Sequence, residues 1–120
     1  MKLYDSELRI MEILWERGDT TAKRLAELLR EQIVWSKTTT YTVIKKCYDK
    51  GAISRHEPNF VCHALITKEQ AQEMETTELI NKMYGGRSDM LVASILGSNT
   101  LTADEIKKLK ELIIKTTEEP

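Results

Sequence analysis

The chain has 120 residues, of which 41% are hydrophobic and 31% charged, and its formal net charge is −1. This length suits one domain or a small domain with an appendage, and the composition is that of an ordinary soluble globular protein. No apolar run approaches the roughly 20 residues of a membrane span, and the N-terminus lacks a secretory signal pattern. We therefore expect a cytoplasmic protein without membrane contact. Cys47 and Cys62 have no CxxC spacing, which in a reducing compartment favours two buried free thiols.

The small net charge conceals an uneven distribution of basic and acidic residues. Residues 35–56 contain five Lys or Arg and one Asp, whereas residues 57–120 contain seven basic and eleven acidic side chains. Basic charge is therefore concentrated in one short segment. This pattern indicates a local contact with a polyanion and not a generally basic protein.

Three helices are predicted within the first 50 residues. The first has Ser6 as its N-cap and Gly18 as its C-terminal stop, with apolar residues at helical spacing between them. The second follows Thr21, a further N-cap, and carries a leucine stripe. The third begins at Ser36 and ends at Gly51.

The next segment has the composition of β structure. Residues 52–56 and 60–65 are short runs rich in apolar or β-branched residues, and Glu57, Pro58 and Asn59 between them carry turn chemistry. We predict a two-stranded hairpin here. Three helices followed by a hairpin is the element order of a winged helix-turn-helix.

From Thr67 onward the pattern is helical and acidic. Thr67 opens a capping box, and the helix that follows stops at Gly85. Ser88 is predicted to cap a short helix, and Thr102 opens a second capping box before the last helix. These roughly 54 residues are too few for a comfortable independent core, so we expect their apolar faces to pack against a second copy of the chain. The alternative is that they fold back on the first domain. The predicted dimerisation residues are Leu79, Ile80, Met83, Leu91, Ile95, Ile106, Leu109 and Ile113.

The third helix has two distinct faces on a 100° wheel. Thr40, Val43, Ile44 and Cys47 share the side expected to be buried. The opposite, exposed side carries Thr38, Tyr41, Thr42, Lys45 and Asp49, flanked by Thr39 and Lys46. Hydroxyls and backbone amides at a helix N-terminus hold phosphates well, and the side chains that follow reach base edges in a major groove. The alternative is a solvated polar face whose hydroxyls serve only as local caps.

Other functional classes find little support in the sequence. In a winged fold the hairpin tip, here Arg55, His56 and Asn59, is placed to touch the neighbouring DNA backbone. His56 and His63 lack a second metal-ligand type at useful spacing, so we expect ordinary strand residues. No catalytic motif is present, and we expect neither an enzyme nor a cofactor or metal site.

Three stretches together resemble the BlaI/MecI/CopY repressors. These are ELRIMEILWERGDTTAKRLAELL, WSKTTTYTVIKKCYDKGAI and the helix break at Gly85–Gly86. The family patterns E-x-x-V-M-x-x-[LI]-W, W-S-x-x-T-[VI]-x-T-[LI] and K-G have counterparts at Glu7, Ile10, Met11, Leu14 and Trp15, at Trp35, Ser36, Thr39, Thr40, Thr42 and Val43, and at Lys50 and Gly51. The resemblance covers nearly the whole chain.

The resemblance implies a homodimeric transcriptional repressor with two domains. Residues 1–66 would form a winged-helix DNA-binding domain and residues 67–120 a helical dimerisation domain of three helices. Such repressors bind inverted-repeat operators, often with TACA/TGTA half-sites, and control β-lactam resistance or copper genes. The predicted DNA-binding set, from the wheel, the hairpin and the family positions together, is Thr21, Ser36, Lys37, Thr38, Thr39, Tyr41, Thr42, Lys45, Lys46, Arg55 and Asn59.

The chain departs from the family patterns in three places. Tyr41 stands where relatives often carry Arg. Because Tyr cannot pair bidentately with guanine, the half-site preferred by this chain can differ from that of its relatives. The C-terminal CxCxxxxCxC cluster of the copper branch is missing. In the β-lactam branch a membrane sensor-protease system signals upstream, and the repressor is cut at an Asn-Phe bond. The matching stretch here contains Ala93, Ser94 and Ile95. A winged-helix protein-interaction module without sequence-specific DNA binding is the alternative function.

Overall fold

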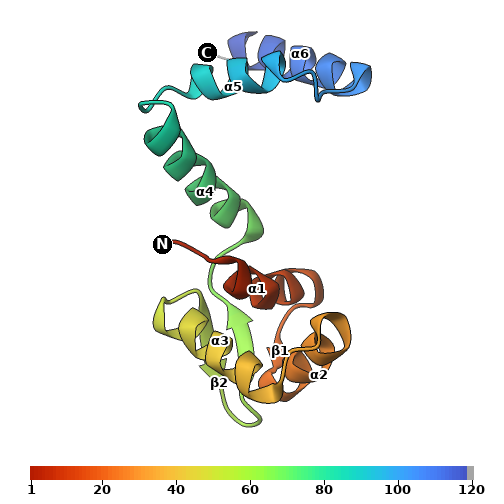
Figure 1. Cartoon of the computed structure of the whole chain (residues 1–120), viewed down its shortest axis with the longest axis vertical. Coiled ribbons are helices and arrows are strands. Elements are labelled where there is room, and N and C mark those ends of the chain that lie inside the picture. Colours follow the sequence, from red (N-terminus) through yellow and green to blue (C-terminus); the bar gives the residue numbers. More distant parts are fainter. Residues whose placement is uncertain (119–120) are drawn as a thin grey trace. The chain divides into compact units, whose positions relative to one another are not determined.

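The computed structural model describes residues 1–118, which contain six α-helices and three short β-strands (Figure 1). In chain order the elements are α1 (Asp5–Arg17), β1 (Thr20–Thr21), α2 (Ala22–Ile33), α3 (Lys37–Asp49), β2 (Ile53–His56), β3 (Val61–Ala64), α4 (Lys68–Met83), α5 (Ser88–Gly97) and α6 (Ala103–Glu118). The chain divides into two compact units, Met1–Thr76 and Thr77–Pro120, so the division falls within α4. The predicted domain boundary between residues 66 and 67 stays a prediction. Residues 119 and 120 of the predicted dimerisation domain lie outside the described residues.

The first unit contains a three-stranded antiparallel sheet in the order β1-β3-β2. The predicted hairpin is confirmed as β2 and β3, which pair with Ile53 opposite Ala64. The sequence analysis did not predict β1, in which Thr20 pairs with Cys62 on the other edge of β3. Two residues are too few to show the alternation by which a strand is recognised, so this strand had no sequence signal.

One hydrophobic core joins α1, α2 and α3 to the sheet, and the three helices surround it in Figure 1. Burial of a large aliphatic side chain stabilises the fold by about 1.5–3 kcal/mol, so this core fixes the orientation of α3. Half-buried Trp15 adds a polar link, because its indole N–H donates to the carbonyl of Ile66 at 2.9 Å. The largest fully buried apolar side chains are Ile10, Met11, Leu25, Leu29, Ile44, Cys47, Ile53 and Cys62.

Capping side chains set where most helices begin. A hydroxyl oxygen that accepts from a backbone N–H three residues later satisfies one of the unpaired donors of the first turn. Four predicted caps are confirmed, at distances of 3.0–3.1 Å: Thr21 accepts from Arg24, Ser36 from Thr39, Thr67 from Gln70 and Thr102 from Glu105.

Two predicted caps were wrong. The first helix begins one residue before Ser6, because the carboxylate of Glu7 accepts from the backbone N–H of Tyr4 at 2.8 Å and closes the first turn there. The fifth helix begins at Ser88 itself, and Arg87 is its N-cap residue. Its first turn closes on the carbonyl of Arg87, which accepts from the N–H of Met90 at 3.1 Å.

The second unit has no interior of its own in a single chain. Among residues 77–118 no side chain is buried. Ten large apolar side chains are exposed there, which is a large number for a segment of this length. No helix within residues 1–118 has the length and apolar character needed to cross a membrane. The exposed side chains are Leu79, Met83, Met90, Val92, Ile95, Leu96, Ile106, Leu112, Ile113 and Ile114.

Candidate nucleic-acid interface

Helix α3 presents one buried and one exposed face, as the wheel predicts. Thr40, Val43, Ile44 and Cys47 are its buried residues. The hydroxyl of Thr40 has no hydrogen-bond partner among the residues that the structure describes, so this threonine contributes packing alone. The run of three threonines therefore serves two purposes, because one member completes the core and its neighbours face solvent.

The first turn of α3 is built around the hydroxyl of Ser36. This oxygen accepts from the backbone N–H of Thr39 at 3.1 Å, and its own hydrogen is donated to the hydroxyl of Thr39 at 3.0 Å. One turn later, the hydroxyl of Thr42 donates to the carbonyl of Thr38 at 2.9 Å. The hydrogen of Thr42 is thus committed to the helix, and its outward oxygen is left as an acceptor.

Tyr41 is half-buried, although the sequence predicted an exposed ring. Its ring meets the ring of Phe60 in a T-shaped contact, with the centroids 5.9 Å apart. The ammonium of Lys37 lies 5.7 Å from the centroid of the Tyr41 ring. The wheel placed Tyr41 correctly on the outer face, but it did not reveal that the turn between β2 and β3 reaches that face.

The wing, defined here as β2, β3 and residues 57–60 between them, carries its own ion pair. Arg55 Nε donates to Glu57 Oε1 at 2.6 Å, and this bond lowers the pKa of the Glu57 carboxyl. The Arg55 guanidinium also lies 3.6 Å from the centroid of the Phe60 ring. Asn59 is exposed at the tip with a positive φ of 73°, a conformation that asparagine tolerates well.

The basic side chains of the predicted interface differ in their partners. Lys45 pairs with Asp49 one turn along α3 at 2.7 Å, just as Arg55 pairs with Glu57. Among residues 1–118, Lys37 and Lys46 have no ion-pair partner, and both are exposed. A phosphate would meet Lys37 and Lys46 directly, whereas it would have to compete with a carboxylate for the other two.

Thr21 lies next to the wing although it is far from it in the sequence. It ends β1 opposite Val61 and caps α2, and the next backbone N–H, that of Ala22, donates to the carbonyl of Phe60 at 3.0 Å. The start of α2 and the wing are therefore adjacent in the structure. The start of α3 joins them through the Tyr41–Phe60 contact.

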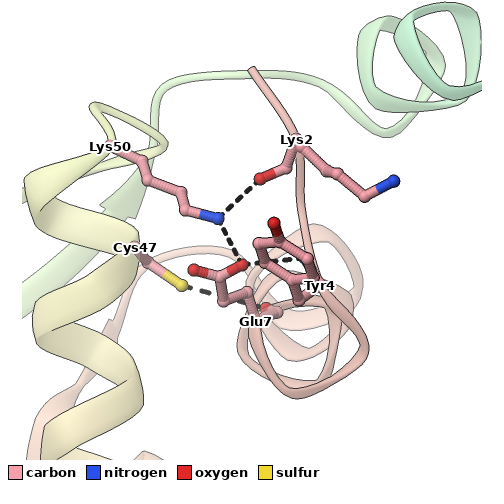
Figure 2. A network of polar contacts seen from close by, with 5 residues as sticks. All are labelled: Lys2, Tyr4, Glu7, Cys47 and Lys50. Atoms are coloured by element: carbon pink, nitrogen blue, oxygen red, sulfur yellow. Dashed lines mark hydrogen bonds and ion pairs between the residues drawn. The ribbon is translucent and has the colours of Figure 1, made fainter. Parts of the chain in front are cut away.

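A buried carboxylate at the other end of α3 is a feature that the sequence analysis missed (Figure 2). The side chain of Glu7 is only 2% exposed, and its Oε1 accepts from Lys50 Nζ at 2.6 Å. The same ammonium donates to the carbonyl of Lys2 at 2.6 Å and lies 4.4 Å from the centroid of the Tyr4 ring. Glu7 is four residues before buried Met11 on the apolar face of α1, and a carboxylate at such a position is the signal that could have revealed this contact.

The cysteines are free and buried, as predicted. Burial raises the pKa of the Cys47 thiol from its usual 9.0 to about 12, and the neighbouring Glu7 carboxylate adds to this shift. Burial likewise raises the pKa of Cys62 to about 11. His63 Nδ1 lies 2.6 Å from Asp19 Oδ1, which ties β3 to the turn after α1. Within residues 1–118 no group of three His, Cys, Asp or Glu side chains is placed to hold a metal ion.

The predicted dimerisation and cleavage residues lie in α4, α5 and α6. None of the eight predicted dimerisation side chains is buried, and Met83 and Ile113 are 64% and 56% exposed. Ala93, Ser94 and Ile95 lie inside α5, where the Ser94 hydroxyl accepts from the Tyr84 hydroxyl at 3.1 Å.

The chain matches the profile of the family described as "Penicillinase repressor" over residues 3–115. Methicillin resistance regulatory protein MecI of Staphylococcus aureus is 28% identical over 116 residues, which cover 95% of this chain and 94% of that protein. A penicillinase repressor of Bacillus licheniformis is 24% identical over 114 residues, covering 93% and 89%. In fold, the solution structure of the DNA-binding domain of the repressor BlaI covers 57% of this chain and 87% of that one, with a TM-score of 0.54 and 24% identity.

Proposed function

The chain belongs to the penicillinase repressor family, and from this premise we propose that it acts as a homodimer on an inverted-repeat operator. The family consists of DNA-binding transcriptional repressors and not of enzymes. By analogy with MecI and the penicillinase repressors, the controlled genes would be of the β-lactam-resistance type. The observation that carries the proposal is the outer face of α3, where hydroxyls and cations surround a capped helix N-terminus.

In this proposal the exposed face of α3 occupies a major groove. Thr38, Tyr41, Thr42 and Lys45 follow one another along that face, and together with Lys37 they line one shallow depression. Thr38, Tyr41, Thr42 and Lys45 would contact base edges. Because the hydrogen of Thr42 is already donated to the Thr38 carbonyl, Thr42 would accept from an amino group of adenine or cytosine.

The phosphate contacts would lie at the edges of this face. The set comprises hydroxyls at helix starts and cations on α3 and the wing. A hydroxyl at a helix start and the N–H groups beside it are suited to an anion, and exposed cations release counterions when they neutralise a phosphate. Its members are Thr21, Ser36, Lys37, Thr39, Lys46, Arg55 and Asn59.

Dimerisation would use the second unit. Its exposed apolar side chains would be buried by packing against the same surface of a second copy. A two-fold dimer presents two α3 helices to successive turns of the major groove, which suits an inverted repeat. A membrane sensor-protease system acting upstream would end repression by cutting α5 near Ala93 and Ser94. Because a helix does not fit a protease site, the bond would have to be exposed by local unfolding of α5.

The test is fluorescence anisotropy with a TACA/TGTA inverted repeat and a scrambled duplex, each at low and moderate salt. A preference of about 10³ for one duplex that persists in added salt would support a sequence-specific repressor. The Lys46→Ala variant should weaken binding to both duplexes by the same factor, because a phosphate contact carries no sequence information. If the family repeat is not preferred, the same assay is repeated with a duplex selected from a random pool. Equal, salt-labile binding to every duplex would refute the proposal and favour a protein-interaction module.

A further inference from the structure

We propose that Phe60 of the wing is a positioning residue for base recognition, because it holds the Tyr41 ring in the orientation that faces the DNA. The inference rests on the proposed DNA binding and adds a specificity-determining pair, Tyr41 and Phe60, to it. Phe60 itself would not touch a base. Its effect on sequence preference would pass entirely through Tyr41.

The first support is that Phe60 is itself held firmly from several sides. Its backbone N–H donates to Glu57 Oε2 at 3.2 Å, and its carbonyl accepts from the N–H of Ala22 at 3.0 Å. The Arg55 guanidinium covers its ring at 3.6 Å from the centroid. Phe60 is thus a fixed part of the wing, joined to the start of α2.

The second support is the backbone conformation of Phe60. Its φ is 52°, in the left-handed region that a bulky aromatic residue rarely adopts. Such conformations cost about 1–3 kcal/mol and are concentrated at functional sites, where the surrounding structure maintains them. Here the left-handed residue is the one that carries the ring in contact with α3.

The third support is the position of Tyr41 between two partners. The Phe60 ring makes a T-shaped contact with the Tyr41 ring, with centroids 5.9 Å apart, and the Lys37 ammonium lies 5.7 Å from the Tyr41 centroid. A side chain held in its bound orientation before association loses less conformational entropy on binding. A fixed phenol ring can distinguish base pairs by contact with a thymine methyl group and by one hydrogen bond, whereas a rotating ring would average over them.

The experiment is a double-mutant cycle read out as base preference. Every base pair of the preferred half-site is replaced in turn, and binding is measured for the full-length wild type and for Tyr41→Ala. The position where Tyr41→Ala abolishes discrimination is the base pair that Tyr41 reads. Phe60→Leu is then measured alone and combined with Tyr41→Ala.

We expect Phe60→Leu to reduce discrimination about 5-fold at that base pair only, in line with the loss of one aromatic pair. It should have no effect on discrimination in the Tyr41→Ala background. Phe60→Tyr keeps the ring and should retain wild-type preference. Tyr48→Leu removes an exposed ring from the same helix and is the matched control, with no change expected. If Phe60→Leu does not fold, Phe60→Met takes its place in the cycle, because methionine fills a similar space without an aromatic ring.

Four outcomes would overturn the inference. Discrimination that falls equally at all positions would make Phe60 a general contributor to binding. An equal effect with and without Tyr41 would show that Phe60 acts independently of it. If no base pair loses discrimination in Tyr41→Ala, Tyr41 reads no base and Phe60 cannot act through it. Sequence-specific binding by the wild type would in that case still uphold the proposed function. Absence of any preference in the wild type would instead refute the proposed function and this inference together.

Discussion

At the scale of single residues, Glu7 shows how a buried charge can be accommodated. Its carboxylate accepts from the Tyr4 N–H and from Lys50 Nζ, and the backbone carbonyl of Glu7 is the acceptor for the Cys47 thiol at 3.9 Å (Figure 2). A buried carboxylate is tolerated only when it is paired and hydrogen-bonded. This cluster therefore links the N-terminal segment and α1 to the C-terminal end of α3.

Loss of Lys50 should be costly for this reason. Replacement of Lys50 by Met leaves Glu7 charged, buried and without its cation, and we expect the free energy of unfolding to fall by about 3 kcal/mol. The measurement is urea denaturation. Combining Lys50→Met with Glu7→Gln should recover much of the loss. Lys46→Met alters an exposed lysine of the same helix and should stay within about 0.5 kcal/mol of the wild type. Equal stability of the Lys50 and Lys46 variants would show that the pair contributes little.

The two buried thiols predict a decline of stability at high pH. Their folded pKa values, about 12 for Cys47 and about 11 for Cys62, lie above the usual 9.0. Stability from the neutral thiols is thus fully present below pH 9.0 and is lost as the pH rises through the folded values. Thermal denaturation between pH 8 and 12 should show a shallower decline for Cys47→Ala/Cys62→Ala than for the wild type. Parallel profiles would contradict the assignment.

At the scale of elements, the start of α3 combines a structural and a proposed binding task in one hydroxyl. Ser36 caps the helix through Thr39, and in the proposal it also faces a phosphate. Aspartate caps a helix about as well as serine, but its charge repels a phosphate. Substitution at this position can therefore separate the two tasks.

For Ser36→Asp we expect unfolding free energy within about 0.5 kcal/mol of the wild type and an operator affinity about 100-fold lower. Circular dichroism during denaturation and anisotropy measure the two quantities. Thr67→Asp makes a comparable change at the cap of α4, outside the predicted interface, and should leave affinity unchanged. Wild-type affinity in Ser36→Asp would mean that no phosphate approaches Ser36.

The elements that the sequence predicted correctly depend on local patterns. The caps at Thr21, Ser36, Thr67 and Thr102 each need only a residue and a neighbour three positions on, and the faces of α3 follow from helical periodicity. The features that were missed depend on distant contacts. Strand β1 exists because β3 has a free edge, and the burial of Tyr41 depends on where the wing turns.

The site residues can be divided in the same way. The sequence was sufficient to place the hydroxyls and lysines on one face of α3. It could not reveal that Arg55 already has a carboxylate partner in Glu57, because that ion pair depends on how the wing turns. The Lys45–Asp49 pair has i,i+4 spacing, a sequence signal that the analysis did not use. The roles of these residues at DNA stay predictions.

At the scale of the whole molecule, the proposed dimer would be held together by the second unit. No side chain is buried among residues 77–118, and in the proposal a second copy would cover the apolar ones. We therefore expect the stability of this unit to depend on protein concentration. We expect Ile113→Lys to raise the dimer dissociation constant about 100-fold, because an ammonium would replace an apolar contact. Analytical ultracentrifugation measures this constant. Glu111→Lys, also in α6 but outside the apolar set, is the control. A wild type that is monomeric at every concentration would refute dimerisation.

The carboxylates beside Lys45 and Arg55 have a consequence for how the protein searches a genome. A repressor must find few sites among millions of competing ones, and loosely placed cations hold it on all of them. In the proposed interface, Lys45 and Arg55 would meet random DNA already paired with Asp49 and Glu57. Lys45 and Arg55 would become available only where the DNA fits closely enough to displace those carboxylates. We therefore expect short residence on unrelated sequence, so that most of the protein remains free to scan instead of being titrated by the chromosome.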